Sequence, residues 1–328
     1  MAHYEEQEEI ETVGGGLNVT PEEITKIKEM LMDTSLPVAP RFRAVFTLRN
    51  IGGELAIDAL AEALMADKSA LLKHEIAYVL GQMQNPHAIP YLNQVLADAE
   101  EDPMVRHEAG EALGAIGDPK SLEVLERFAT DPRPEVSETC SLAIDTIKYK
   151  LKENKKTPNH PSPYCSVDPA PRYSTDDVQK LKTRLLDESL PLFKRYRAMF
   201  ALRDIGDTEA VEALAAGFRD SSALFRHEIA YVLGQMAHEH AAPSLTVILK
   251  DMNEHYMVRH EAAEALGAIA SSEIMPMLQD FCNDKEQVVR ESCLVAVDVS
   301  DYNTSDTFEY ADTLKIIREQ AAATVESS

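Results

Sequence analysis

The sequence contains an internal duplication, and its most regular element is a His-Glu pair that occurs four times. The pairs are His74-Glu75, His107-Glu108, His227-Glu228 and His260-Glu261. The two pairs of each half lie 33 residues apart (74 to 107, 227 to 260), and equivalent pairs of the two halves lie 153 apart (74 to 227, 107 to 260). A duplicated chain can place its equivalent side chains face to face across a pseudo-two-fold axis.

Apolar residues around each pair follow a helical period. In the first copy, Leu72, Ile76, Val79, Leu80 and Met83 stand at offsets 0, 4, 7, 8 and 11, and the other copies have apolar residues at the same offsets. This spacing is typical of the buried stripe of an amphipathic helix. Each striped segment follows a second helical segment, which gives a helix–turn–helix unit with a period of 31 to 33 residues. Runs of alternating β-branched residues are absent, so we predict almost no β-sheet.

A repeat of this length indicates a solenoid of stacked helical hairpins. The ankyrin signature is absent, and a chain without Trp lacks the tetratricopeptide pattern, so short HEAT-like repeats fit best. We predict an all-α fold, an α-solenoid of eight short HEAT-like helical hairpins in two homologous four-repeat halves. The outer repeats lack His-Glu, and Glu138 and Glu291 stand near the histidine positions. We therefore predict that these repeats cap the halves without binding a ligand.

Composition sets the expected domain boundaries. We predict an acidic flexible tail at 1–20, HEAT-like domains at 21–150 and 176–300, an exposed Pro-rich linker at 151–175, and an acidic C-terminal tail at 301–328 that holds at most a short helix. The first residues lack the basic and apolar regions of a signal peptide. The expected localisation is cytoplasmic, with a nuclear fraction left open.

Charge limits the partners of this chain. A net charge of −24 argues against nucleic acid, whose phosphates require Lys and Arg. No apolar run approaches the roughly 20 residues that a membrane helix needs, so we expect no membrane partner. The charge suits a cationic substrate, although a generic solubility charge explains it as well. The four cysteines include no CxxC motif, which disfavours a zinc–thiolate site.

The His-Glu pairs lie outside the apolar stripe of their helices. At about 100° per residue, the stripe centres at about 25°, His lies at about 200° and Glu at about 300°. One such pair on a helix is usually a solvated polar face, but four copies at fixed register favour a shared function. Imidazole with carboxylate suits iron or manganese, and two His with one carboxylate is the facial set of non-haem iron oxygenases. Two metals, each held by one half, account for the number of candidates.

The repeats and their motifs resemble a known family. HEIAYVLGQM and RHEA(G/A)EALGAI each occur twice, and over roughly residues 20–300 the chain resembles deoxyhypusine hydroxylases. The resemblance implies a monomeric non-haem di-iron monooxygenase that uses two iron ions, Fe²⁺ in the resting reduced state, with O₂ as co-substrate. It also implies a protein substrate, the eukaryotic translation initiation factor that carries deoxyhypusine, whose hydroxylation completes hypusine synthesis. Di-iron carboxylate proteins usually carry Glu-x-x-His on a four-helix bundle, a spacing that these His-Glu pairs lack.

The resemblance also divides the ligands between the metals and the substrate. It implies that iron is held mainly by His74, His107 and Glu108 of one half and by His227, His260 and Glu261 of the other. Glu75 and Glu228 then lie nearer the substrate and orient its amines, and they remain candidates for iron ligation too. Two alternatives stay open, a non-catalytic HEAT-like interaction scaffold and a bilin lyase-type HEAT-like protein. Both predict no stoichiometric iron.

Overall fold

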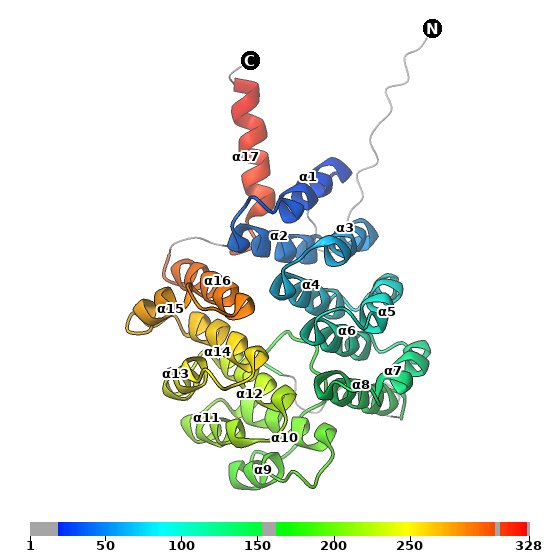
Figure 1. The fold of residues 1–328 in the computed structure, drawn as a ribbon, viewed down its shortest axis with the longest axis vertical. Coiled ribbons are helices and arrows are strands. Elements are labelled where there is room, and N and C mark those ends of the chain that lie inside the picture. Colours follow the sequence, from blue (N-terminus) through cyan, green and yellow to red (C-terminus); the bar gives the residue numbers. More distant parts are fainter. Residues whose placement is uncertain (1–18, 153–161, 306–308, 327–328) are drawn as a thin grey trace.

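The chain folds into stacked helices, which Figure 1 shows in sequence order. The computed structural model describes residues 19–152, 162–305 and 309–326, and these ranges contain no β-strand, as predicted. The helices of the first half are α1 (Pro21–Met32), α2 (Val38–Ile51), α3 (Gly53–Ala66), α4 (Ala70–Gln82), α5 (Ile89–Ala97), α6 (Pro103–Ile116), α7 (Leu122–Phe128) and α8 (Pro134–Lys152). Those that follow are α9 (Val178–Leu185), α10 (Leu192–Ile205), α11 (Thr208–Ala215), α12 (Ala223–Met236), α13 (Ala242–Lys250), α14 (Tyr256–Ile269), α15 (Met275–Phe281), α16 (Gln287–Asn303) and α17 (Thr313–Glu326). Short 3₁₀ helices at Pro86–Ala88, Pro119–Ser121, Ala216–Arg219 and Glu239–Ala241 lie between them.

Successive helices form hairpins with one outer and one inner helix. Each odd-numbered helix from α1 to α15 contacts the even-numbered helix that follows it. The inner helices also contact one another in order, α2 to α8 in one half and α10 to α16 in the other. The predicted α-solenoid of helical hairpins is therefore confirmed, whereas the number of eight repeats stays a prediction.

Close packing of the inner helices explains the glycine that recurs in the His-Glu motifs. A Cβ atom on Gly81 of α4 would lie 2.7 Å from Cα of Ala112 in α6, and one on Gly267 of α14 would lie 2.6 Å from Cα of Ala296 in α16. Any larger side chain would push the neighbouring backbone away. These glycines therefore set the spacing of the helices that carry the His-Glu pairs.

The two halves meet at both ends and close a ring. Helix α16 contacts α2 and α4, and α8 contacts α10 and α12. At one junction the Ser69 hydroxyl donates to Glu291 Oε2 at 2.6 Å, and at the other the Ser222 hydroxyl donates to Glu138 Oε2 at 2.5 Å. The outer repeats were predicted to cap two solenoid ends. That prediction is wrong, because these repeats join the halves and their glutamates form the connecting hydrogen bonds.

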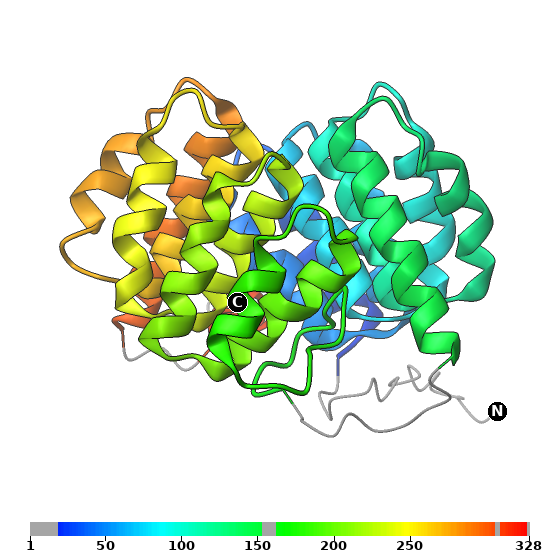
Figure 2. The same ribbon diagram turned by 90° about the horizontal axis from the view of Figure 1, so that it is seen from below.

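The segment between the halves is partly built into the structure, which corrects the prediction of an exposed linker. Helix α8 extends to Lys152, and residues 153–161 lie outside the described residues. From Ser162 onward the segment lies across the junction of the halves (Figure 2). There the Val167 N–H donates to Gln82 Oε1 of the first half at 2.8 Å, and Asp168 pairs with Arg203 of the second half at 2.7 Å.

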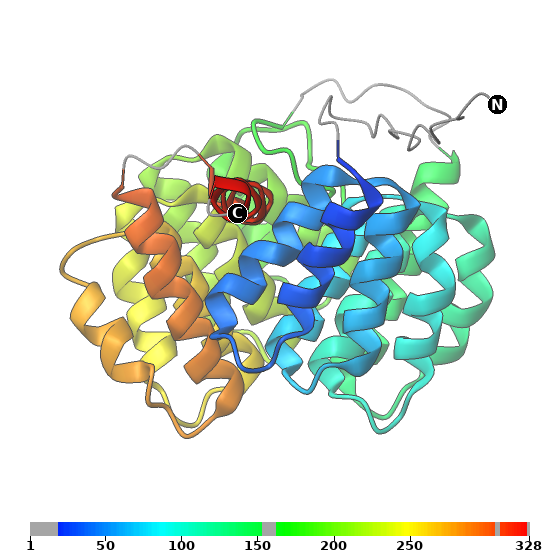
Figure 3. The ribbon, with the colours of Figure 1, turned by 90° about the horizontal axis from the view of Figure 1, so that it is seen from above.

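The C-terminal segment also contacts the ring. Helix α17, longer than the short helix that was expected, lies against α1 and α2 (Figure 3). Arg318 Nε donates to Glu23 Oε1 at 2.6 Å. The predicted N-terminal tail, 1–20, lies outside the described residues except for its last two positions. Within the described part of the chain, no helix combines the length and the apolar character needed to cross a membrane.

Candidate metal centre

All four His-Glu pairs meet in the centre of the ring. They lie on the inner helices α4, α6, α12 and α14, and none of the eight residues is more than 7% exposed. The helical wheel placed them outside the apolar stripe, which is correct for each helix. The interpretation as a solvated face is nevertheless wrong, because ring closure turns the polar faces of the two halves toward each other and buries them.

The four imidazoles form one cluster across the two halves. The ring centroid of His74 lies 5.5 Å from that of His107, 5.7 Å from that of His227 and 5.2 Å from that of His260. Ligand atoms of His74, His107 and Glu108 lie within 4.8 Å of one another, and so do those of His74, His227 and His260. The structure thus brings the predicted histidines of both halves within reach of shared or adjacent metal ions.

Two carboxylates repeat the same geometry in the two halves. Glu108 Oε2 lies 3.2 Å from His74 Nε2 and 4.0 Å from His107 Nε2. Glu261 Oε2 lies 3.3 Å from His227 Nε2 and 4.0 Å from the corresponding nitrogen of His260. Each half therefore presents two imidazoles and one carboxylate, the set expected of a non-haem iron site.

The other two glutamates of the motifs have a different environment. No ion pair joins Glu75 or Glu228 to an imidazole in the described ranges of the chain. Glu228 Oε1 is buried and has no hydrogen-bond partner. Among the glutamates of the four motifs, only those on α6 and α14 therefore lie beside the histidines.

The nitrogen atoms of the cluster fit a bound metal. The Nε2 atoms of all four histidines are buried and make no hydrogen bond, a costly state for a polar atom unless a ligand binds it. Hydroxyl groups face the other ring nitrogen in two cases, Thr139 Oγ1 at 3.5 Å from His107 Nδ1 and Ser292 Oγ at 3.4 Å from His260 Nδ1. A partner on Nδ1 orients the ring and leaves Nε2 for the metal.

Thr139 and Ser292 were missed by the sequence analysis. They stand 153 residues apart, next to Cys140 and Cys293, and therefore share the register of the His-Glu pairs. That register was the available signal, because a hydroxyl residue at both copies of one position marks a duplicated role.

Burial controls the charge of the histidines. It lowers the pKa of His107 and of His260 well below the usual range, and it lowers the pKa of His227 to about 3. These three imidazoles are neutral at pH 7, which is the form that binds metals. Burial also opposes the charge on His74, but the combined attraction of Glu108, Glu261 and Glu264 outweighs it and raises the pKa of His74.

The carboxylates accumulate unfavourable negative charge. Burial, together with repulsion between neighbouring carboxylates, raises the pKa values of Glu75, Glu228 and Glu261 well above the usual range. A cation placed among them would reverse this penalty. The centre is therefore suited to positively charged ligands, either metal ions or protonated amines.

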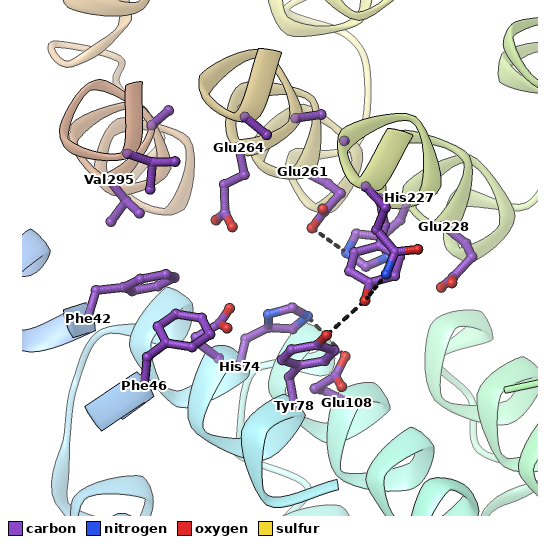
Figure 4. Close-up of a pocket in the computed structure, with 18 of the residues that line it drawn as sticks. Phe42, Phe46, His74, Tyr78, Glu108, His227, Glu228, Glu261, Glu264 and Val295 are labelled. Carbon is purple, nitrogen blue, oxygen red and sulfur yellow. Dashed lines mark hydrogen bonds and ion pairs between the residues drawn. The ribbon is translucent and has the colours of Figure 1, made fainter. Parts of the chain in front are cut away.

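A pocket of about 360 Å³ opens beside the cluster. Figure 4 shows Glu228 near one end of it and Phe42, Phe46 and Val295 at the other. The hydroxyls of Tyr78 and Tyr231, which are equivalent residues of the two halves, lie 2.8 Å apart and span the middle. Two further carboxylates, Glu111 and Glu264, also line the pocket.

Known proteins similar to this chain agree with the motif analysis. HEAT repeats match residues 57–145, 178–256 and 213–298, and a PBS lyase HEAT-like repeat matches residues 40–64. Deoxyhypusine hydroxylase of Danio rerio is 53% identical over 294 residues, 89% of this chain and 96% of the relative. Deoxyhypusine hydroxylase of Homo sapiens is 53% identical over 300 residues, 92% of this chain and 98% of the relative. The chain belongs to the deoxyhypusine hydroxylase family.

A solved structure agrees with this identification. The structure of human deoxyhypusine hydroxylase in complex with glycerol superimposes with a TM-score of 0.83 at 53% identity and covers 86% of this chain and 97% of that chain. The family resemblance drawn from the His-Glu motifs is confirmed, and the chain is a hydroxylating enzyme of hypusine biosynthesis. The scaffold and bilin lyase alternatives are therefore set aside.

Proposed function

We propose that this deoxyhypusine hydroxylase is a non-haem di-iron monooxygenase that hydroxylates the deoxyhypusine side chain of the translation initiation factor. The observation that carries the proposal is the duplicated set of two imidazoles and one carboxylate, with every Nε2 atom buried and without a hydrogen bond. Two iron ions, Fe²⁺ in the resting reduced state, would supply with O₂ the oxidising power that an unactivated C–H bond requires.

The residues that would hold the irons follow from the repeated geometry. They are His74, His107 and Glu108 of the first half and His227, His260 and Glu261 of the second. The hydroxyls of Thr139 and Ser292 would keep two of the rings in orientation. Because the set is divided between residues 21–150 and 176–300, we also propose that these ranges are two domains that the metal centre joins.

The other glutamates would bind the substrate. Deoxyhypusine is a lysine extended by an aminobutyl group, so it carries two amines that are cationic at pH 7. Glu75 and Glu228 line the pocket without contacting an imidazole, and Glu228 Oε1 has an unfilled acceptor position. Carboxylates buried at this depth bind an ammonium group strongly because no water competes. The apolar side chains of the same pocket suit the methylene groups between the amines.

Metal analysis of the purified protein tests the proposal. We expect about two irons per chain from the two ligand sets, and loss of iron in His227→Ala. Glu228→Ala is expected to keep the iron and to lose substrate binding. His87→Ala serves as the control, because His87 is a half-exposed histidine that pairs with Asp58 at 2.7 Å, away from the cluster. A folded protein with no iron would contradict the proposal, and equal iron loss in both glutamate and histidine variants would make Glu228 a ligand.

A further inference from the structure

The duplication gives the pocket two pseudo-equivalent sides, each with a pair of glutamates. The lining includes Glu75 and Glu264, and it also includes their counterparts Glu228 and Glu111. These pairs are equivalent, since both of their members are related by 153 residues (75 to 228, 111 to 264). A symmetric pocket would offer the same surroundings to a ligand on either side.

The side with Glu75 and Glu264 continues into an apolar passage. Phe42 and Phe46 of α2 face Val295 and Val299 of α16 there, and Tyr310 of the C-terminal segment completes the lining. Figure 4 shows Phe42, Phe46 and Val295 beyond Glu264 at this end. The passage lies between the first inner helix of one half and the last inner helix of the other, where the ring closes.

Among the described residues, the pocket lining does not continue into such a passage on the side with Glu228 and Glu111. The counterparts of the passage residues, 153 or 154 positions away, are Tyr196, Phe200, Leu142 and Thr146, and none of them lines the pocket. All four are buried. Instead, the Thr146 hydroxyl donates to the carbonyl of Pro169, in the segment that joins the halves.

The joining segment is held firmly over this side. Arg203 is 0% exposed and donates two hydrogen bonds to Asp168, at 2.8 and 2.7 Å, and one to Ser162 Oγ at 3.0 Å. The paired guanidinium–carboxylate bonds fix both position and orientation. Its counterpart on the open side, Arg49, is only partly buried. The segment 162–170 thus closes one side of a pocket whose equivalent side stays open.

The closed side also contains a buried polar atom without a hydrogen-bond partner. Glu228 is 2% exposed, and its Oε1 atom makes no hydrogen bond although it belongs to the pocket lining. A buried carboxylate oxygen in the pocket lining that lacks a partner indicates a ligand that donates a hydrogen bond.

We propose that the substrate diamine enters only between α2 and α16 and binds in one direction. Its terminal primary ammonium reaches the closed side and binds Glu228 together with Glu111. Its secondary ammonium, nearer the protein backbone of the substrate, binds Glu75 together with Glu264. The methylene groups between the two amines then lie beside the histidine cluster. This inference rests on the proposed function and adds Glu111, Glu264 and the segment 162–170 to the determinants of substrate orientation.

Matched glutamate variants and matched peptides test this direction. One peptide carries Nε-(4-aminobutyl)lysine, and a second carries Nε-butyllysine, which lacks only the terminal amine. Binding is measured by calorimetry on the iron-loaded and on the iron-chelated protein, without O₂ so that no turnover occurs. Glu111→Gln should weaken the binding of the Nε-(4-aminobutyl)lysine peptide about tenfold, which is the effect of losing one charge-assisted hydrogen bond. It should leave the binding of the Nε-butyllysine peptide unchanged. Glu264→Gln should weaken the binding of both peptides equally. Glu264 Oε1 also accepts a hydrogen bond from Ser292 Oγ at 2.9 Å and lies 3.5 Å from His260 Nδ1, so this effect must also appear in the iron-chelated protein.

A longer peptide probe tests the closed side in the unmutated protein. Nε-(6-aminohexyl)lysine has two additional methylene groups, and we expect it to bind at least about tenfold more weakly because the closed side cannot accept the added volume. The inference is overturned if removal of the terminal amine changes the effect of Glu264→Gln, or if it changes the effect of neither variant. It is also overturned if the longer probe binds as tightly as the aminobutyl peptide. Iron content is not a readout in either experiment, so an iron-free protein would refute the proposed function alone.

Discussion

Ser69→Ala is expected to lower the free energy of unfolding by about 2.5–4 kcal/mol, because one hydroxyl makes two structural contacts. Ser69 Oγ accepts a hydrogen bond from the Leu72 N–H at 3.1 Å and caps α4, and the loss of such a cap removes about 1 kcal/mol. The same hydroxyl donates to Glu291 Oε2 across the ring junction at 2.6 Å. A hydrogen bond to a charged group contributes about 1.5–3 kcal/mol.

Further variants separate the two contributions. Glu291→Gln keeps the cap and weakens only the bond across the junction, so it should cost less than Ser69→Ala. The pair Ser222 and Glu138 repeats the arrangement at the other junction, and Ser222→Ala should therefore give nearly the same loss. Ser141→Ala, at an exposed position, is the control and should change stability by less than about 0.5 kcal/mol.

Urea unfolding of the iron-chelated protein, followed by far-UV circular dichroism, provides the measurement. Chelation matters because iron would add its own stabilisation to the folded state. The reasoning is refuted if Ser69→Ala is no more destabilising than the exposed control. It is refuted as well if the Ser69→Ala and Glu291→Ala effects add without a coupling energy, since residues in direct contact do not behave independently.

Helix packing, buried charge and the metal centre each lead to one further prediction. Gly267→Ala should cost about 1–3 kcal/mol in urea unfolding because its Cβ would lie 2.6 Å from Cα of Ala296, whereas Gly110→Ala, whose nearest neighbours are side-chain atoms at 3.3 and 3.4 Å, should cost less. Folding lowers the pKa of His227 from its usual 6.5 to about 3, so His227 favours the folded state above pH 6.5 and this contribution is lost as the pH falls toward 3. The iron-chelated His227→Asn variant should therefore lose less stability over this pH range, and an unchanged slope would contradict the assignment. Iron removal should lower the melting temperature of the unmutated protein, and an unchanged melting curve would argue against a metal centre that joins the halves.

Local periodicity was sufficient to predict the elements that carry the site. The offsets around His74 placed one stripe of apolar residues on a helix, and its 33-residue and 153-residue repeats placed the other three pairs on equivalent helices. Equivalent positions of a duplicated solenoid necessarily share a face. The shared face of the His-Glu side chains within each half is therefore encoded in the register of the sequence, while their roles as ligands stay a prediction.

Contacts between distant segments could not be predicted in this way. Closure of the ring depends on hydrogen bonds such as Ser69 to Glu291, which join residues 222 positions apart without any local pattern. The Pro-rich segment 162–170 has no periodicity, so its composition suggested an exposed linker. Its burial depends on Gln82 and Arg203, which belong to different halves and become neighbours only after the ring has closed.

Two segments lie outside the duplicated repeats, and they determine the direction in which a pseudo-symmetric scaffold binds an asymmetric substrate. Deoxyhypusine has a secondary and a primary amine, and a pocket with two equivalent sides would bind it equally well in two directions. Discrimination requires a difference in free energy between the two orientations, and duplicated helices supply none. In this chain the segment 162–170 closes one side, while Tyr310 of the C-terminal segment lines the other. The repeats can therefore supply the metal ligands in pairs, and the segments outside the repeats can supply the direction of binding.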